Sequence, residues 1–293
     1  MVVIKKIKEK IIDKKMKKYL AIGGLILASC TETEIEYIEK EIEMETAGET
    51  TLVLDAVYGD IDFELNKPMD YKFVGGNEEI DIKYEFTNLR YWVSNVILIN
   101  EDGEEFLVPD SHYLVEETNE IPIQDGSYNK VYPAHKREKI AIAAIPVGNY
   151  SGIKFSIGVA PEYNDNLSLQ SGELNPLNGM SKSSWHWHTS YIFTSISGEM
   201  EVFKDEPESK SFIWEVGSND YYIQKEIQFD SPITISSKTT SAINLEFDVK
   251  KTLEFDAPWE NNFIGASKPD LMEQLTNNHI AAISLVTADF EVQ

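Results

Sequence analysis

The chain has 293 residues and a formal net charge of −24, with 50 acidic side chains against 26 basic ones. A charge of this sign repels nucleic-acid phosphates and anionic lipid surfaces, and it favours cationic partners, including metal ions. We therefore expect no nucleic-acid partner. Cys30 is the single cysteine, so no disulfide can form within the chain.

The first 29 residues have the order of an export signal. Eight lysines and two acids lead into an apolar run from Tyr19 to Leu27, and Ala28, Ser29 and Cys30 follow. This is a positive n-region, a short h-region and a small-residue cleavage site. Because the run is well short of the roughly 20 residues that a membrane span needs, a retained transmembrane helix is the weaker interpretation.

The string Leu-Ala-Ser-Cys at positions 27–30 is more specific than a general cleavage site, because the thiol of Cys30 is the group that receives a lipid. The alternative is an ordinary core cysteine at the end of a buried helix. We predict a lipoprotein signal peptide at 1–29 and a lipid at Cys30. The protein would then sit on the outer membrane, on its periplasmic or cell-surface side, with the thiol unavailable for chemistry.

Removal of the leader, which carries +6, takes the remaining net charge from −24 to −30. Residues 30–46 are almost alternately acidic, which is typical of a solvated segment. We interpret them as a tether, with a first edge strand as the alternative. Residues 47–293 show no composition shift and no internal repeat, and we expect them to form one domain.

Short apolar segments with turn residues between them recur from Thr50 onward, which is the pattern of a β-sandwich. We predict an all-β fold, a β-sandwich with long loops and one short C-terminal helix. In that helix Ser267 is expected to be the N-cap, Pro269 the first helical residue and Asp270 the partner of the cap. The expected strands lie at 52–57, 80–86, 91–99, 106–108, 139–144, 153–159, 191–196, 210–214, 223–229, 233–235, 245–249 and 283–286.

Trp185-His186-Trp187-His188 is the most unusual string of the sequence. On a strand, His186 and His188 would share one face and the two indoles the other, so both imidazoles could bind one metal ion. Imidazole suits copper, zinc, nickel or iron. A third donor must come from elsewhere, and the choices are His112, His135, His279, Glu215 and Met180.

The alternative for this string is a surface strand whose indoles pack on the core. His112 and His135 lie in loop-like surroundings and could simply be solvated, whereas His279 is expected at a helix end, where a cation is favourable.

The sequence has no Gly-rich phosphate loop, no G-x-S-x-G elbow and no H-E-x-x-H helix, so we expect no enzyme. With 50 acids, a carboxylate pair of the glycosidase kind can be neither located nor dismissed.

Several strings resemble one family. Residues 91–96 (YWVSNV), 101–103 (EDG) and 110–115 (DSHYLV) are similar to an aromatic strand, an acidic-Gly turn and a following strand of the MbnP-like family, the methanobactin-associated periplasmic copper-binding proteins. The similarity is greater in the second half. There, residues 146–150 (PVGNY), 157–164, 171–180 (SGELNPLNGM) and 185–198 resemble the family's P-x-G-x-Y turn, G-V-D segment, G-M loop and W-x-W strand.

This resemblance implies an extracytoplasmic β protein that binds copper near a tryptophan-bearing strand. In some relatives a tryptophan is oxidised to kynurenine by a di-haem peroxidase of the MbnH type, so Trp185 and Trp187 would be the positions for that change. The chain departs from the family pattern in two ways. Four residues separate Met180 from Trp185, and Glu215 stands where the family has a histidine. A carboxylate favours Cu(II) or Zn(II) over Cu(I).

The leading hypothesis is a lipid-anchored, non-enzymatic metal-binding protein. The metal would be copper, with zinc as the alternative, bound by His186, His188 and Glu215, with His112 as a further donor. Its partners would be the lipid membrane through Cys30 and a di-haem peroxidase. The alternative is a structural or interaction β-sandwich lipoprotein that has lost the metal site.

Overall fold

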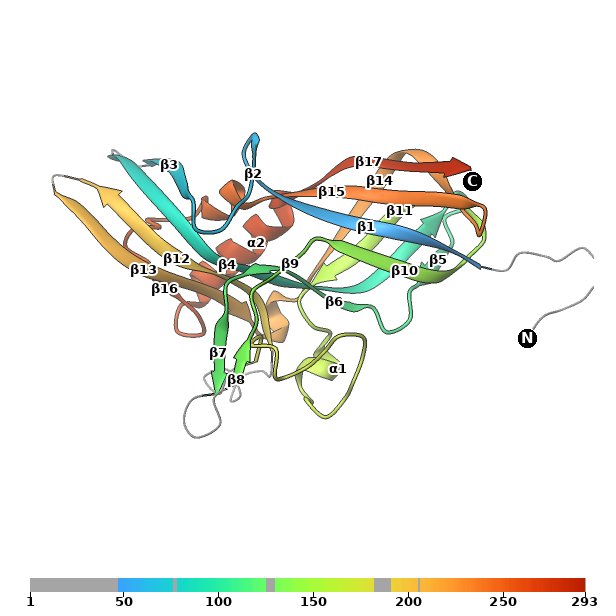
Figure 1. The fold of residues 1–293 in the computed structure, drawn as a ribbon, viewed down its shortest axis with the longest axis horizontal. Helices are drawn as coiled ribbons and strands as arrows, with labels where there is room; N and C mark the ends of the chain where they lie inside the picture. The colour runs from blue at the N-terminus through green and yellow to red at the C-terminus, as the bar shows by residue number, and fades with distance from the viewer. Residues whose placement is uncertain (1–46, 76–77, 125–129, 182–190, 205, 293) are drawn as a thin grey trace, which may run out of the picture. The chain divides into compact units, whose positions relative to one another are not determined.

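The structure is a computed structural model that describes residues 47–292, except for 76–77, 125–129, 182–190 and 205. Residues 46–293 form one compact unit. The predicted signal peptide, Cys30 and the tether lie outside the described residues. Strands dominate, which confirms the all-β prediction (Figure 1). No helix in the described part of the chain is long and apolar enough to cross a membrane.

Two packed sheets make up the sandwich. The smaller sheet has the order β10 (Lys139–Pro146), β1 (Ala47–Tyr58), β15 (Thr239–Asp248) and β17 (Ile283–Val292), with β2 (Ile61–Asp62) paired to β1. The path of the larger sheet is β14 (Ile223–Ile235), β11 (Gly148–Ile157), β4 (Glu78–Asn100), β12 (Ile192–Phe203), β13 (Pro207–Gly217) and β16 (Phe263–Ile264).

Further strands extend the larger sheet around β4. They are β3 (Pro68–Gly75), β5 (Glu105–Leu107) and β6 (His112–Thr118), with β9 (His135–Arg137) paired to β6. A separate hairpin consists of β7 (Ile121–Gln124) and β8 (Lys130–Tyr132). The helical elements are α1 (Pro161–Asn164), α2 (Pro269–Ala282) and the 3₁₀ turns η1 (Asn219–Tyr221) and η2 (Val249–Leu253).

The two segments predicted at 80–86 and 91–99 form one strand of 23 residues, β4. No Gly or Pro lies between them, so the chain has no residue there that would end a strand. The register against β12 shifts between Ser197 and Gly198 instead, which marks a bulge. A side chain at Gly198 would place its Cβ within 2.2 Å of the Glu85 carbonyl oxygen, so only glycine fits at this bulge.

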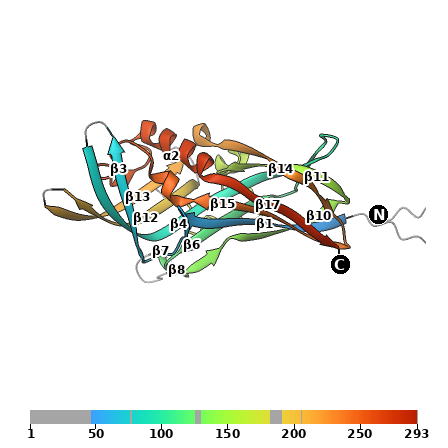
Figure 2. The ribbon, with the colours of Figure 1, turned by 90° about the horizontal axis from the view of Figure 1, so that it is seen from above.

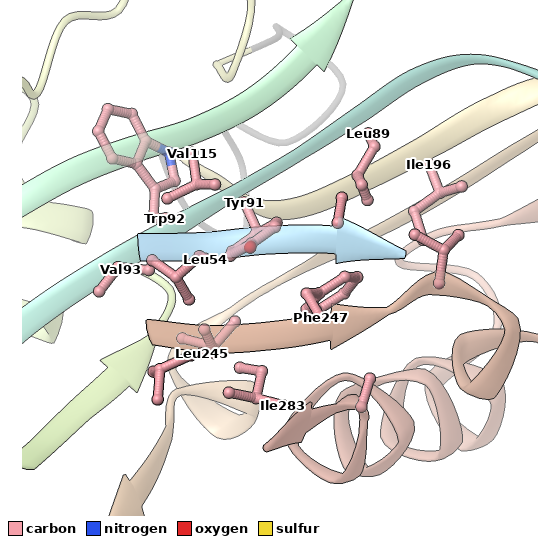
Figure 3. Packing of buried hydrophobic residues seen from close by; sticks show 14 of the residues in the cluster. Leu54, Leu89, Tyr91, Trp92, Val93, Val115, Ile196, Leu245, Phe247 and Ile283 are labelled. Atoms are coloured by element: carbon pink, nitrogen blue, oxygen red, sulfur yellow. The ribbon is translucent and has the colours of Figure 1, made fainter. Parts of the chain in front are cut away.

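The core lies between β4 and the two central strands of the smaller sheet. Leu89, Tyr91 and Val93 of β4 face Leu54 of β1 and Phe247 of β15 (Figure 3). The rings of Tyr91 and Phe247 stack with their centroids 4.7 Å apart. Since complete burial of one large apolar side chain contributes roughly 1.5–3 kcal/mol, this contact layer is a main source of stability.

Helix α2 is the predicted C-terminal helix, and Pro269 is its first residue as expected. The expected cap is wrong, because the N-cap position is Lys268 and no side chain caps the helix there. Met272 and Leu275 are buried, and α2 contacts η2 and β13. Figure 2 shows α2 above the sheet, on the side of β13 and β14, with which it is in contact. The apolar pattern did not predict β2, β3, β7, β8, β9 and β16, because these strands are very short or carry polar and charged residues, and β6 was implied only by the family resemblance of residues 110–115.

Candidate functional site

Strand β4 is buried on both faces between Asn88 and Ser94. Its odd-numbered residues face the core, and its even-numbered residues Arg90, Trp92 and Ser94 point to the opposite side. Figure 3 shows Tyr91 and Trp92 pointing to opposite sides of β4. On this side of β4, Arg90 contacts the loop that ends at Met180 and the two-stranded β7–β8 hairpin.

Arg90 and Glu116 form a buried ion pair at the centre of this polar layer. Arg90 Nε donates to Glu116 Oε2 at 2.7 Å, and the two side chains are 1% and 2% exposed. The same carboxylate accepts a hydrogen bond from the Tyr132 hydroxyl and contacts His135 Nδ1 at 2.8 Å. Burial and the Glu116 carboxylate raise the pKa of Tyr132 to about 12, so the phenol stays protonated and donates.

The same guanidinium holds the surrounding segments in place. Arg90 Nη2 donates to the Asn178 carbonyl oxygen at 2.7 Å, and the Arg90 guanidinium lies 4.6 Å from the centre of the Tyr132 ring. One buried cation therefore ties β4 to the loop before Met180 and to β8. A buried charge with this number of partners fixes the geometry of the elements that it joins.

A groove of about 360 Å³ opens beside Arg90. Its floor is the face of β4, β12 and β13, where Arg90, Ser195 and Glu215 stand opposite one another in register. The chain between β6 and β7 and the loop at Gly179 provide the walls. Residues that line the groove are Thr87, Asn88, Arg90, Asn119, Glu120, Ile121, Pro122, Gly179, Ser195, Ser197, Ile213 and Glu215.

Glu215, a predicted metal ligand, lies on β13 in the groove lining and is 4% exposed. Its backbone pairs with Ser195 of β12, and β12 begins directly after the segment that carries His186 and His188. His186, His188, Trp185 and Trp187 lie outside the described residues. Tyr191 N donates to Asn164 Oδ1 at 3.0 Å, and Ile192 N donates to the Met180 carbonyl oxygen at 2.8 Å, so the two ends of that segment meet beside the groove.

The structure does not bring His112 and Glu215 together. His112 pairs with Ser94 on the β6 side of β4, whereas Glu215 lies beyond β12 on the other side. The two are three strand spacings apart, or about 14 Å across the sheet. One metal ion cannot bind both side chains. The described residues contain no group of three or more His, Cys, Asp or Glu that could hold a metal ion.

His112 is the first residue of β6 and is 2% exposed, so its expected loop position was wrong. Its Nδ1 lies 2.9 Å from Ser171 Oγ, its ring packs on the edge of Tyr163, and its Nε2 has no hydrogen-bond partner. Burial lowers the pKa of His112 to about 4 against the opposing effect of Asp110. At neutral pH it is an uncharged imidazole with an unused nitrogen.

The remaining predicted third donors have other roles. His135 begins β9, is half-exposed and contacts Glu116. His279 does lie in the last turn of α2, but it is not the expected cation, because burial lowers its pKa to about 4. Its Nδ1 bonds the Leu275 carbonyl oxygen at 2.6 Å. Met180 is fully buried in the core.

Sequence reasoning missed Arg90, Glu116 and Asn88. The available signal was an arginine and an asparagine inside an otherwise apolar strand, in the string Asn88-Leu89-Arg90-Tyr91-Trp92. A charged residue at such a place is seldom buried without a partner. Its partner Glu116 could not be identified, because the sequence holds 50 acidic residues and the pairing depends on the β4–β6 register.

The comparison with protein-family models agrees with the sequence resemblance. Comparison with curated proteins finds no match. Among solved structures, the chain is similar to MbnP from Methylosinus trichosporium, with 15% sequence identity and a TM-score of 0.38 over 71% of this chain and 77% of that one. The family model of MbnP matches residues 47–273, which is most of the chain. The chain therefore belongs to the MbnP family.

Proposed function

We propose that this protein is an exported, lipid-anchored, non-enzymatic copper-binding protein whose metal ligands are His186, His188 and Glu215. The observation that carries the proposal is the position of Glu215. It stands where the family has a histidine, its side chain lies in the groove lining, and both ends of the histidine-bearing segment meet beside the same groove.

Chain length permits this ligand set. Tyr191 is four residues before Ser195, which stands opposite Glu215, so about 13 Å of strand separates Tyr191 from the level of Glu215. His188 is three residues before Tyr191, and because an extended chain spans at most about 3.6 Å per residue, a chain that turns back at Tyr191 brings the His188 side chain within reach of Glu215. Two imidazoles and a carboxylate are a donor set that suits Cu(II) or Zn(II). His112 is a separate donor, because it lies across the sheet from Glu215. Its unused Nε2 would make it at most a second, weaker site.

Copper titration of the purified mature protein tests the ligand set. The His186→Ala/His188→Ala double variant should lose high-affinity copper binding, whereas His112→Ala should retain it. Affinity should also fall as the pH drops through about 6 to 5, because ligand imidazoles must be neutral. A double variant that binds copper like the parent would overturn the proposal, and it would favour the alternative of a structural lipoprotein without a metal site.

Glu215→His places the family's residue back in the groove lining. If Glu215 faces the metal, the variant should bind Cu(I) more tightly than the parent, since imidazole is a softer ligand than carboxylate. Glu215→Gln serves as the matched control, because it keeps the shape of the side chain and removes its charge. Equal Cu(I) affinities for all three proteins would show that Glu215 is not a ligand.

The anchor is tested separately at Cys30, the single cysteine of the chain. Cys30→Ala should leave the protein unprocessed or release it from the membrane fraction. Intact mass of the native protein would show the lipid directly, together with any oxidised tryptophan at Trp185 or Trp187 and any bound metal. A neighbouring gene for a di-haem peroxidase would support the proposed partner. Normal processing and unchanged fractionation of Cys30→Ala would contradict the lipoprotein assignment.

A further inference from the structure

The groove also has the features of a site for a small organic cation. We propose that the face of β4, β12 and β13 binds an aliphatic diamine, with one ammonium group in the groove at Asn88 and the other at the carboxylates of Glu85 and Glu199. This site is distinct from the proposed metal ligands, and it depends on residues that the structure describes.

Asn88 forms the buried end of the site. It lines the groove and is 7% exposed. Its Nδ2 donates to the Ser195 carbonyl oxygen at 3.1 Å and to Ser195 Oγ at 3.0 Å. Its Oδ1 has no hydrogen-bond partner. A buried acceptor without a donor is costly, and an ammonium group in the groove would supply that donor.

The charges around the groove favour a cation. Arg90 is the basic residue in the lining, and its charge is balanced by Glu116 at 2.7 Å. The lining also contains the carboxylates Glu120 and Glu215, and the other polar side chains are hydroxyls and amides. Because Glu116 balances Arg90, the carboxylate of Glu120 leaves the lining with a net negative charge even without a contribution from Glu215, so an anionic ligand would be repelled and a neutral one would gain less than a cation.

Glu85 and Glu199 form the exposed end. They stand directly opposite each other on β4 and β12, and both are exposed. Like charges at such a position are destabilising, and an ammonium group between them would remove the repulsion. Glu199 Oε1 accepts one hydrogen bond, from Ser211 Oγ at 2.8 Å. Lys83, in the next row of β4, limits the acidic stretch on that side.

The spacing of the two ends matches a short diamine. Ser197 stands opposite Asn88, and Glu199 is two residues further along β12 on the same face. Two residues of a strand cover about 7 Å, which is close to the separation of the two nitrogens of an extended four-carbon diamine. The groove volume of about 360 Å³ is large enough to admit a ligand of this size.

Calorimetric titration of the full-length mature protein with putrescine tests the proposal, with 1,4-butanediol as the neutral probe of equal length. Putrescine should bind with a dissociation constant at least about tenfold lower than that of butanediol. Glu199→Gln and Glu85→Gln, both on exposed side chains, should each weaken putrescine binding several-fold. Glu291→Gln makes the same charge change on β17, away from the groove, and should leave binding unchanged.

An NMR titration tests the buried end without a variant. The side-chain amide signal of Asn88 should shift with putrescine and stay in place with butanediol. Copper affinity should be unaffected by Glu199→Gln, so failure of this proposal and failure of the metal proposal are distinguishable. Equal binding of putrescine and butanediol would overturn the diamine site. So would an equal loss in Glu199→Gln and Glu291→Gln, because binding would then depend only on the overall charge.

Discussion

Arg90 and Tyr91 are adjacent on β4 and are both almost fully buried, yet they belong to two different regions of the molecule. Tyr91 stacks on Phe247 in the apolar core, and Arg90 pairs with Glu116 beneath the groove. One strand therefore supports stability on one face and the candidate site on the other. The two faces should respond differently to mutation, because an apolar layer depends on contact area and an ionic layer on charge balance.

The largest expected effect is that of Arg90→Met, which leaves Glu116 buried without its cation. We expect a loss of about 3–5 kcal/mol in the free energy of unfolding at neutral pH. The double variant Arg90→Met/Glu116→Leu should recover a large part of this loss, because no buried charge remains. Urea unfolding of the parent, both single variants and the double variant measures the coupling. A double variant as unstable as Arg90→Met would show that packing, not charge, is what Arg90 contributes.

The next largest expected effect is that of His279→Leu on how the free energy of unfolding depends on pH. Because burial depresses the folded-state pKa of His279 to about 4 from an ordinary value of 6.5, the unfolded chain binds a proton more readily. The contribution of neutral His279 to stability is present above pH 6.5 and is lost as the pH falls towards 4. The parent should therefore lose about 2 kcal/mol more than His279→Leu between pH 7 and pH 5.

Unfolding of both proteins at the two pH values measures this difference. Burial also lowers the pKa of His112, so the stability of His279→Leu should still fall somewhat at acid pH. Parallel stability curves for the parent and the variant would show that His279 titrates normally in the folded protein.

Tyr91→Phe should change the free energy of unfolding by a smaller amount, and it should raise it, whereas Arg90→Met lowers it. The Tyr91 hydroxyl is buried without a hydrogen-bond partner, and burial raises its pKa well above the ordinary value. Removing it keeps the stacked ring and should raise the free energy of unfolding by up to about 1 kcal/mol. A thermal unfolding experiment on the variant is sufficient. A clear loss of stability would mean that the hydroxyl has a partner in solution.

The smallest expected effect is that of Glu85→Gln, which removes the like-charge contact with Glu199. We expect a gain of a few tenths of a kcal/mol that disappears at high salt, since the side chains are exposed. Chemical unfolding at low and at high ionic strength measures the gain. A loss of stability in Glu85→Gln would mean that the two carboxylates are already bridged by a cation.

The sequence was sufficient to predict the fold class and the apolar, core-facing side of β4. Short apolar segments between turn residues identified strands such as 52–57 and 91–99, because a buried strand leaves a run of apolar residues in the sequence. It was not sufficient for the ionic face. The pairing of Arg90 with Glu116 depends on which residue of β6 stands opposite Arg90, and register between strands that are 26 residues apart has no local signature.

The metal ligands show the same limit. His186 and His188 could be proposed from spacing alone, and Glu215 from the resemblance, but the sequence could not separate His112 from them. The register does so, because it places His112 and Glu215 on opposite sides of β4. The prediction that His279 is a cation was wrong for a similar reason. Its position at the helix end could be predicted from the sequence, but its burial, which lowers its pKa, could not.

The most direct test of the proposed function is the position of copper in crystals of the mature protein, measured by anomalous diffraction at the copper edge. We expect one strong peak at the groove, within coordination distance of the Glu215 carboxylate and of imidazole nitrogens from His186 and His188. A single peak at His112 Nε2, or no ordered copper in crystals soaked with the metal, would contradict the assignment of the groove as the metal site.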